Sequence, residues 1–325
     1  MTGSASPMMP GVYRMTRNGS VCLPALLAAL MAGSGTALGE RWVLNVEPVA
    51  DGVYVHQGVH EDVLEDNRGD IANVGFVVGD DCVAVIDTGG SPEVGAALRR
   101  AIAAVTEEPV CYVINTHVHP DHILGNSAFL GDAPEFVGHA RLKAQLEARG
   151  PYYLRSISRM LGTELDDDVL VMPDVAVSDH LRLNLGGRQL LLEAMPRAHT
   201  DNDLVILDEA TDTLWLGDLL FVDRVPSLDG SLRGWLSVLA DLGERDVARV
   251  VPGHGPASVD WPQAAEPLRR YLQTLLEETR AAIHQGATIE QAAGVVGQSE
   301  RGAWKLFEDY HQRNVQNAYA ELEWE

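Results

Sequence analysis

Basic residues are scarce in this chain of 325 residues. Lys and Arg total 24 against 47 Asp and Glu, which gives a formal net charge of −23 at pH 7. Proteins that bind nucleic acid or an anionic membrane surface present a basic stripe or patch, and this composition lacks one. The charge therefore excludes both classes of partner. It is compatible with attraction of a cationic partner, although a solvated acidic surface explains it without any function.

Apolar runs long enough to cross a membrane are also missing. The longest run covers residues 21–31, follows two arginines and precedes small residues at positions 35–39. That order is typical of a secretory signal peptide, and the run is too short for a retained anchor. We expect residues 1–37 to be a cleaved signal and the mature protein to be periplasmic or secreted, with no membrane anchor. Met15 is an alternative start, and an uncleaved amphipathic extension is the alternative to a signal.

Histidine and aspartate are concentrated in one short segment. His117, His119, Asp121 and His122 fall within six positions, directly after an apolar strand expected at residues 112–114. Imidazole nitrogen and carboxylate oxygen are ligands that suit Zn²⁺. Alternate positions of an extended segment point to the same side, so the first two histidines can share one ion while the next two residues turn toward a second. The segment therefore predicts a metal site.

Three more candidate ligands lie farther along the chain. His199 stands between two expected strands, Asp218 ends the apolar run at residues 214–217, and His254 follows the apolar residues 250–251. Polar side chains at the ends of neighbouring strands converge on the open edge of a sheet. We therefore expect these three residues to complete the metal site.

The order His-x-His-x-Asp-His, His, Asp, His resembles that of the metallo-β-lactamase-fold hydrolases over roughly residues 45–260. The resemblance implies an α/β fold, the αββα sandwich. It also implies the metal ligands: His117, His119 and His199 for one ion, Asp121, His122 and His254 for the other, with Asp218 bridging both. Asp218 stands where the best-known zinc β-lactamases have Cys or Ser, and His119 where diiron flavoproteins have Glu, so neither group is favoured.

Four segments are similar to a narrower group, the zinc metallohydrolases of quinoprotein relay systems. They are residues 199–204, 217–221, 228–232 and 321–325. Members of that group are exported proteins associated with pyrroloquinoline-quinone dehydrogenases. This resemblance implies a link to a periplasmic quinoprotein dehydrogenase system and a small-molecule substrate, which it does not identify.

The hydrophobic pattern agrees with two β-rich halves and a helical tail. Strands expected at 71–78 and 83–87 precede a helix at 91–105, and the next strand completes a parallel β-α-β unit. Strands and one helix recur between residues 181 and 251, so the halves fit a sandwich with ligands from both meeting at one edge. The expected domains are a catalytic domain at 38–260 and a C-terminal helical extension at 261–325, with helices at 264–285 and 301–323 separated by breaks at Gly286 and Gly297.

An insertion at residues 142–179 separates the ligands His122 and His199. Because its two ends start and finish near the metals, its middle is placed to cover them as a lid. A peripheral helical hairpin is the alternative, and the sequence does not decide between them.

Further residues are expected to support the site. Asp87 is expected to orient the histidine segment by hydrogen bonds, and Asp201 or Asp203 to do the same for His199. Asp121 is expected to bind metal and to accept a proton from water, which would make it a catalytic residue.

Only two of the three cysteines remain after signal cleavage, because Cys22 lies inside the predicted signal. In the implied fold, Cys82 and Cys111 stand near the starts of neighbouring parallel strands. A disulfide between them is therefore feasible in an oxidising periplasm, and two buried reduced thiols are the alternative. Neither is expected to bind metal, because the histidines and aspartates already supply both sites.

Two zinc ions bridged by Asp218 would lower the pKa of bound water from about 15.7 toward 7. The resulting hydroxide would attack an acyl carbonyl. Asp218 resembles the aspartate of the glyoxalase II, lactonase and thioester-hydrolase side of the superfamily, and this resemblance implies hydrolysis of a thioester, lactone or ester. The alternatives are a mononuclear iron persulfide dioxygenase, a β-lactamase and a non-enzymatic metal-binding accessory protein. Only two lysines, Lys143 and Lys305, are present, and no basic cluster matches the glutathione-binding positions of glyoxalase II. A small or neutral substrate is therefore expected.

Overall fold

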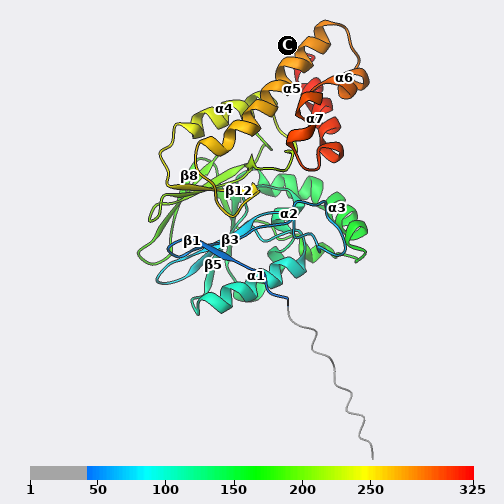
Figure 1. The fold of residues 1–325 in the computed structure, drawn as a ribbon. Helices are drawn as coiled ribbons and strands as arrows, with labels where there is room; N and C mark the ends of the chain where they lie inside the picture. The colour runs from blue at the N-terminus through cyan, green and yellow to red at the C-terminus, as the bar shows by residue number, and fades with distance from the viewer. Residues whose placement is uncertain (1–41) are drawn as a thin grey trace, which may run out of the picture. The chain divides into compact units, whose positions relative to one another are not determined.

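Two β-sheets pack face to face, and helices cover the outer face of each sheet (Figure 1). The computed structural model describes residues 42–325, which fall within one compact unit. This arrangement confirms the predicted αββα sandwich with a helical region at its C-terminal end. The predicted signal peptide lies outside the described residues, as do both alternative starts. Among residues 42–325, no helix is both long enough and apolar enough to cross a membrane.

The first sheet contains the strands of the N-terminal half. Its order is β1 (Glu47–Ala50), β2 (Val53–His56), β3 (Val74–Val78), β4 (Val83–Ile86), β5 (Val110–Ile114), β6 (Glu135–His139) and β7 (Val175–Val177). The first four strands pair antiparallel, whereas β4 to β7 run parallel. Helix α1 (Pro92–Val105) joins β4 to β5, and the Ser91 side chain caps it by accepting a hydrogen bond from Val94 N. The predicted β-α-β unit is therefore confirmed.

The second sheet contains the strands of the C-terminal half. Its order is β12 (Arg249–His254), β11 (Thr213–Phe221), β10 (Leu204–Asp208), β9 (Gln189–Ala194) and β8 (His180–Asn184). β11 and β12 are parallel, and helix α4 (Leu232–Gly243) connects them. The other pairs are antiparallel. All nine residues of β11 are buried, because this strand is covered on both faces.

The main core lies between the two sheets. Val55 and Ile114 of the first sheet belong to the same buried cluster as Leu192, Ile206 and Trp215 of the second. Fully burying an aliphatic side chain contributes about 1.5–3 kcal/mol relative to leaving it exposed. This packing fixes the two sheets against each other and thereby sets the distance between the residues at their common edge.

The C-terminal helices extend the outer layer of the second sheet. They are the 3₁₀ helix η3 (Gln263–Ala265), α5 (Glu266–His284), α6 (Ile289–Val295), the 3₁₀ helix η4 (Gln298–Ala303) and α7 (Phe307–Leu322). Their apolar side chains share one buried cluster with α4 and β11. Gly286 and Gly297 have positive φ angles and break the helices as expected. The expected helix at 301–323 starts later, at residue 307, because Leu306 adopts a left-handed conformation and Trp304 is extended and buried.

The insertion at residues 142–179 is not a helical hairpin. It forms one helix, α3 (Leu142–Leu161), followed by the 3₁₀ helix η2 (Asp167–Val169) and β7. Buried residues of α3 pack on the segment after β5, which contains the short helix α2 (Pro120–Ile123) and the 3₁₀ helix η1 (Asn126–Asp132). The insertion therefore lies beside the histidine-rich segment.

A disulfide joins the first sheet at the start of its parallel strands. Cys82 directly precedes β4 and Cys111 lies in β5, and their Cα atoms are 5.8 Å apart. The bond cross-links two neighbouring strands at the ends opposite to those that carry the histidine-rich segment.

Candidate metal centre

The histidine-rich segment follows β5 at the edge of the first sheet. His117 lies in a bend after the strand, His119 is the extended residue just before α2, and α2 places Asp121 and His122 in its first turn. Asn115 N donates to Val137 O of β6, which fixes the point at which the chain leaves the sheet. Because a short apolar strand is followed directly by a turn, the four polar side chains of this segment lie together at the edge of the first sheet.

The second sheet provides the other three side chains. His199 lies between β9 and β10, Asp218 lies within β11, and His254 ends β12. The close approach of β11 and β12 requires glycine at residue 253, because a Cβ there would lie 2.0 Å from Asp218 Oδ1. The seven predicted ligands thus come from both halves of the chain and meet at one edge of the sandwich.

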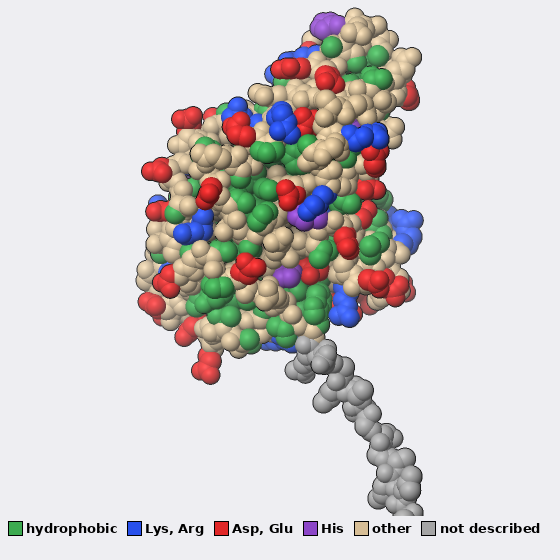
Figure 2. Space-filling model, in the orientation of Figure 1, with side chains coloured by type: hydrophobic (Ala, Val, Ile, Leu, Met, Phe, Trp, Pro, Cys, Tyr) green, Lys and Arg blue, Asp and Glu red, His purple; other side chains and the backbone are tan. Residues whose placement is uncertain are grey.

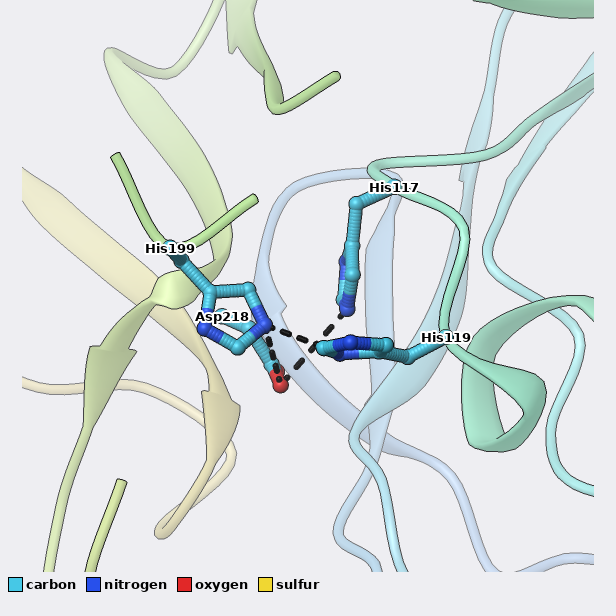
Figure 3. A group of neighbouring side chains, drawn as sticks. All are labelled: His117, His119, His199 and Asp218. Atoms are coloured by element: carbon cyan, nitrogen blue, oxygen red, sulfur yellow. Dashed lines mark hydrogen bonds and ion pairs between the residues drawn. The ribbon is translucent and has the colours of Figure 1, made fainter. Parts of the chain in front are cut away.

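The first group contains His117, His119, His199 and Asp218 (Figure 3). One ligand atom from each of the four residues lies within 4.8 Å of the others. Asp218 Oδ2 is 3.4 Å from His199 Nε2 and 3.6 Å from His117 Nε2. His119 presents its other nitrogen, Nδ1, which lies 2.9 Å from His199 Nε2. Three imidazole nitrogens and one carboxylate oxygen therefore face a common point.

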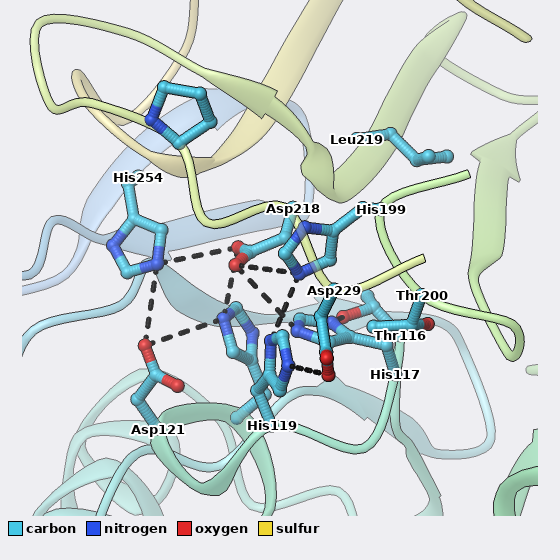
Figure 4. A network of polar contacts seen from close by, with 12 residues as sticks. Thr116, His117, His119, Asp121, His199, Thr200, Asp218, Leu219, Asp229 and His254 are labelled. Atoms are coloured by element: carbon cyan, nitrogen blue, oxygen red, sulfur yellow. Dashed lines mark hydrogen bonds and ion pairs between the residues drawn. The ribbon is translucent and has the colours of Figure 1, made fainter. Parts of the chain in front are cut away.

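The second group contains Asp121, His122 and His254, and it meets the other oxygen of Asp218. Figure 4 shows Asp121 and His254 beside Asp218. Asp218 Oδ1 is 3.1 Å from His122 Nε2 and 3.4 Å from His254 Nε2. Asp121 Oδ2 lies 3.3 Å from His254 Nε2. Asp218 therefore stands between the two groups, with one oxygen toward each.

The inward-facing atoms of both groups fit a bound cation. His117 Nε2, His122 Nε2 and Asp218 Oδ1 are buried and have no hydrogen-bond partner among residues 42–325. Leaving a buried polar atom unsatisfied costs about 1–3 kcal/mol, and three such atoms in two adjoining groups are not a stable arrangement by themselves. Nitrogen and carboxylate donors facing inward are the ligand set of a metal site.

The outward-facing nitrogens are held by hydrogen bonds that orient the rings. His122 Nδ1 bonds Asp87 Oδ2 at 2.8 Å, and His254 Nδ1 bonds the Ile71 carbonyl at 2.7 Å. Asp87 also accepts a hydrogen bond from Thr116 N, at 2.8 Å, and so holds the start of the histidine segment. Such partners fix which nitrogen of the ring is free to bind metal. Asp87 thus lies where the sequence predicts an orienting carboxylate.

His199 is not oriented by either of the two aspartates proposed for it. Asp203 accepts hydrogen bonds from Thr200 N, at 2.9 Å, and from the Thr200 hydroxyl, and burial raises its pKa to about 7. Asp201 bonds Gln145 Nε2 at 3.0 Å. His199 Nδ1 has no hydrogen-bond partner within the described part of the chain. Both aspartates are engaged by nearer donors, so the predicted bond to His199 is wrong, although Asp203 does close the turn that carries His199.

Burial and the neighbouring charges set the protonation of the centre. Burial lowers the pKa of His199 to about 3, so its ring is neutral at pH 7 and offers a lone pair. Burial also lowers the pKa of His117 well below its usual range, and the nearby His122 adds to the effect. Burial alone would raise the pKa of Asp218, but His254, His122 and His117 outweigh it and hold this pKa well below the ordinary value. Asp218 is therefore a carboxylate among imidazoles.

The sequence pattern of residues 67–254 matches the family model of the metallo-beta-lactamase superfamily. That match includes all seven residues of the two groups and spans more than half of the chain. The chain belongs to the metallo-β-lactamase superfamily. No curated protein sequence matches it.

Solved structures of superfamily members share the fold. A metallo-β-lactamase from Pontibacter korlensis is similar, with 20% sequence identity, a TM-score of 0.56, and coverage of 71% of this chain and 99% of that one. The metallo-β-lactamase FIM-1 from Pseudomonas aeruginosa, solved in a mono-zinc form, gives 16% identity and a TM-score of 0.54, with coverage of 71% and 95%. At these identities the likeness shows the fold alone.

A cleft of about 460 Å³ opens onto the centre of this superfamily member, and Asp121, Asp218 and His254 lie in its wall. Helix α3 forms an apolar side of the cleft with Tyr152 and Met160, which are 58% and 43% exposed. Figure 2 shows acidic and basic side chains interspersed over one face of the molecule, without a continuous basic stripe.

Three arginines, Arg149, Arg224 and Arg313, also line the cleft. The sequence shows no basic cluster that matches the glutathione-binding positions of glyoxalase II, and it did not predict that these three arginines meet at the cleft. Arg149 is paired with Asp229. Arg224 is buried and donates only to neutral acceptors, and neither it nor Arg313 forms an ion pair with any residue in 42–325. These positions are separated by up to 164 residues in sequence, so no local pattern could have grouped them.

Sequence reasoning also missed the role of Asp229. Its Oδ2 atom lies 3.1 Å from His119 Nε2, the ring nitrogen that faces away from the first group. His119 and Asp229 are 110 positions apart, and a motif match was the only sequence signal at residues 228–232. Asp229 is thus the orienting partner of His119.

Proposed function

We propose that this protein is an exported hydrolase that holds two zinc ions and cleaves an activated acyl bond in a thioester, lactone or ester. The observation that carries the proposal is the position of Asp218, whose two oxygens face separate ligand groups. Each group adds three side chains of its own. His117, His119 and His199 would hold one ion, and Asp121, His122 and His254 the other.

Bound divalent cations would supply an ionised water at neutral pH and would polarise the carbonyl oxygen of a substrate. The chain contributes the remaining parts. Asp121 is 13% exposed at the wall of the cleft. Burial alone would raise its pKa, but His122 and His254 outweigh this effect and hold the pKa below the ordinary value. Asp121 is therefore ionised and can accept a proton from attacking water.

The cleft supports a substrate that combines an apolar part with an anionic group. Tyr152 and Met160 offer apolar surface on the α3 side. On the α7 side, Arg224 Nη2 donates to Tyr310 Oη at 3.1 Å, and Arg313 is exposed without an ion-pair partner among the described residues. A guanidinium matches a carboxylate through two parallel hydrogen bonds. A carboxylate-bearing thioester or lactone thus fits better than a neutral substrate, one of the two options, small or neutral, that the sequence suggests.

Location and partner complete the proposal. Export rests on the signal-like order of residues 1–37, and a link to a periplasmic quinoprotein dehydrogenase system rests on the four segments that resemble the quinoprotein relay metallohydrolases. A β-lactamase activity is the second candidate, because similar solved structures are of metallo-β-lactamases, one of them exposed to ceftazidime. Asp218 in place of Cys or Ser favours the acyl hydrolase.

The test measures metal content and hydrolysis in the same zinc-loaded preparation. Substrates are paired thioesters and lactones that differ only in a terminal carboxylate or a terminal amide, together with ceftazidime. We expect about two zinc ions per chain, turnover of the thioesters or lactones, and a preference for the carboxylate member. One iron per chain with oxygen uptake would support the dioxygenase instead, and turnover of ceftazidime alone would support a β-lactamase.

Arg313→Gln tests the source of the preference for the carboxylate. Removing one exposed charge–carboxylate contact should lower kcat/KM for the carboxylate member by roughly 5- to 10-fold, and leave the amide member unchanged. The matched control is Arg269→Gln, which removes an exposed arginine that lies outside the cleft lining. An equal loss for both substrates would contradict the assignment of Arg313.

A further inference from the structure

Helix α7 presents a row of polar side chains to the segment that links β11 to α4. Asn314, Asn317 and Glu321 are spaced three and four residues apart, so they lie on one face of the helix. Figure 1 shows α7 among the C-terminal helices that follow α5. The family match ends at residue 254, so α7 lies beyond the part of the chain that defines the superfamily.

The two asparagines bind the start of the linking segment through its backbone. Asn314 Nδ2 donates to Pro226 O at 2.6 Å, and Asn314 Oδ1 accepts a hydrogen bond from Leu228 N at 2.9 Å. Asn317 Nδ2 donates to Leu228 O at 2.6 Å. Asn314 is itself buried and also donates to the Tyr271 hydroxyl at 2.9 Å. Both backbone groups of Leu228 are therefore fixed by α7.

Glu321 binds the end of the same segment, where α4 begins. Its carboxylate accepts hydrogen bonds from the Ser231 hydroxyl at 2.8 Å and from Leu232 N at 2.6 Å. A carboxylate at the first turn of a helix satisfies free N–H groups and is favoured by the helix dipole. The segment is thus held by α7 at both ends.

Between these two anchors, the segment contacts the first ligand group twice. Asp229 Oδ2 is hydrogen-bonded to His119 Nε2 at 3.1 Å, and Asp229 N donates to His199 O at 3.2 Å. Ser231 N donates to Ala198 O at 2.8 Å. This segment and the segment before His199 approach so closely that a Cβ at Gly230 would lie 2.2 Å from Ala198 O. A shift of the segment would therefore move both His119 and His199.

We infer that Asn314, Asn317 and Glu321 of α7 are positioning residues for the metal centre. They hold residues 226–232, and these residues in turn orient the His119 ring and the His199 backbone. In the second group, the rings of His122 and His254 are held by Asp87 and by the Ile71 carbonyl, which lie outside residues 226–232. Through residues 226–232, the C-terminal extension thus positions two ligands of the first group.

The test compares Asn317→Ala with Gln316→Ala, an exposed neighbour on the same helix. Each variant is titrated with Co²⁺, followed by visible absorption, and Zn²⁺ affinity is measured separately by competition with a chelator. We expect Asn317→Ala to weaken one of two ions by about 10- to 100-fold and to change one Co²⁺ spectrum, as loss of a residue behind a ligand typically does. Gln316→Ala should match the unaltered protein.

A second pair of variants separates positioning from folding. Glu321→Gln keeps an acceptor for Leu232 N, whereas Glu321→Ala does not, so the first should restore most of the affinity lost in the second. Both ions binding with unchanged affinity and spectrum in Asn317→Ala and Glu321→Ala would overturn the inference. The inference rests on the proposed metal centre and does not depend on hydrolytic activity. If the unaltered protein failed to bind metal, the proposed metal centre itself would be rejected.

Discussion

Replacing Asp218 by Asn tests the separate roles of the two carboxylate oxygens of Asp218 in the proposed metal centre. Oδ1 lies 3.1 Å from His122 Nε2, and Oδ2 lies 3.4 Å from His199 Nε2, so each oxygen serves a different group. Asparagine keeps one oxygen and turns the other into an N–H₂ donor, which cannot bind a cation. One ion should then lose a ligand and a negative charge but keep three side chains. We expect its affinity to fall by about 100-fold, or about 2.7 kcal/mol.

Metal content after dialysis against buffers of defined free zinc measures this change. Asp203→Asn is the matched control, because Asp203 is buried nearby but bonds Thr200 and no imidazole. Its pKa is raised to about 7 by burial, so a neutral amide resembles the protonated acid and should be tolerated. Two ions held with unchanged affinity by Asp218→Asn would refute the bridging role. Equal losses in both variants would point to general damage to the edge of the sheets.

Three further predictions concern stability and processing. The hydrogen bond from Arg270 holds the pKa of Glu300 below its ordinary value, so the pair stabilises the fold above about pH 4.5, and this contribution is lost as the pH falls through the folded pKa. Glu300→Gln should therefore show a smaller drop in melting temperature between pH 6 and pH 3 than the unaltered protein, and an equal drop would contradict the assignment. Replacing Cys82 and Cys111 by Ser should lower the free energy of unfolding by about 3–4 kcal/mol for a sequence separation of 29, measured with guanidinium chloride, and an unchanged value would contradict a stabilising disulfide. N-terminal sequencing of exported protein should find a chain that begins near residue 38, whereas soluble cytoplasmic protein retaining residues 15–37 would disprove cleavage.

The metal ligands could be predicted because each follows a strong local signal. His117 and His119 follow a short apolar strand, and His254 ends another, so the strand pattern alone places them at a sheet edge. Parallel strands bring such ends together whatever the intervening sequence. The fold class and the β-α-β unit were predictable for the same reason.

The residues behind the ligands could not be predicted in the same way. Asp229 is one of 47 acidic residues, and its partner His119 lies 110 positions earlier. Proximity in sequence gave a wrong partner for His199. Asp203 stands four residues from His199, but it bonds Thr200. The late start of α7 depends on the left-handed Leu306, a conformation that tertiary packing imposes against local preference. The fold decides which side chains come within hydrogen-bonding distance, so these partners cannot be identified from a single sequence.

The ligand groups span the seam between the two sheets, so the centre is also a cross-link. Four ligands come from the first half of the chain and three from the second, and no ion can be fully coordinated until both halves have packed. A ligand present at 100 times its dissociation constant adds about 2.7 kcal/mol to the folded state. Metal bound at this edge would therefore stabilise the packing of the two halves against each other, and a chelator would lower the free energy of unfolding.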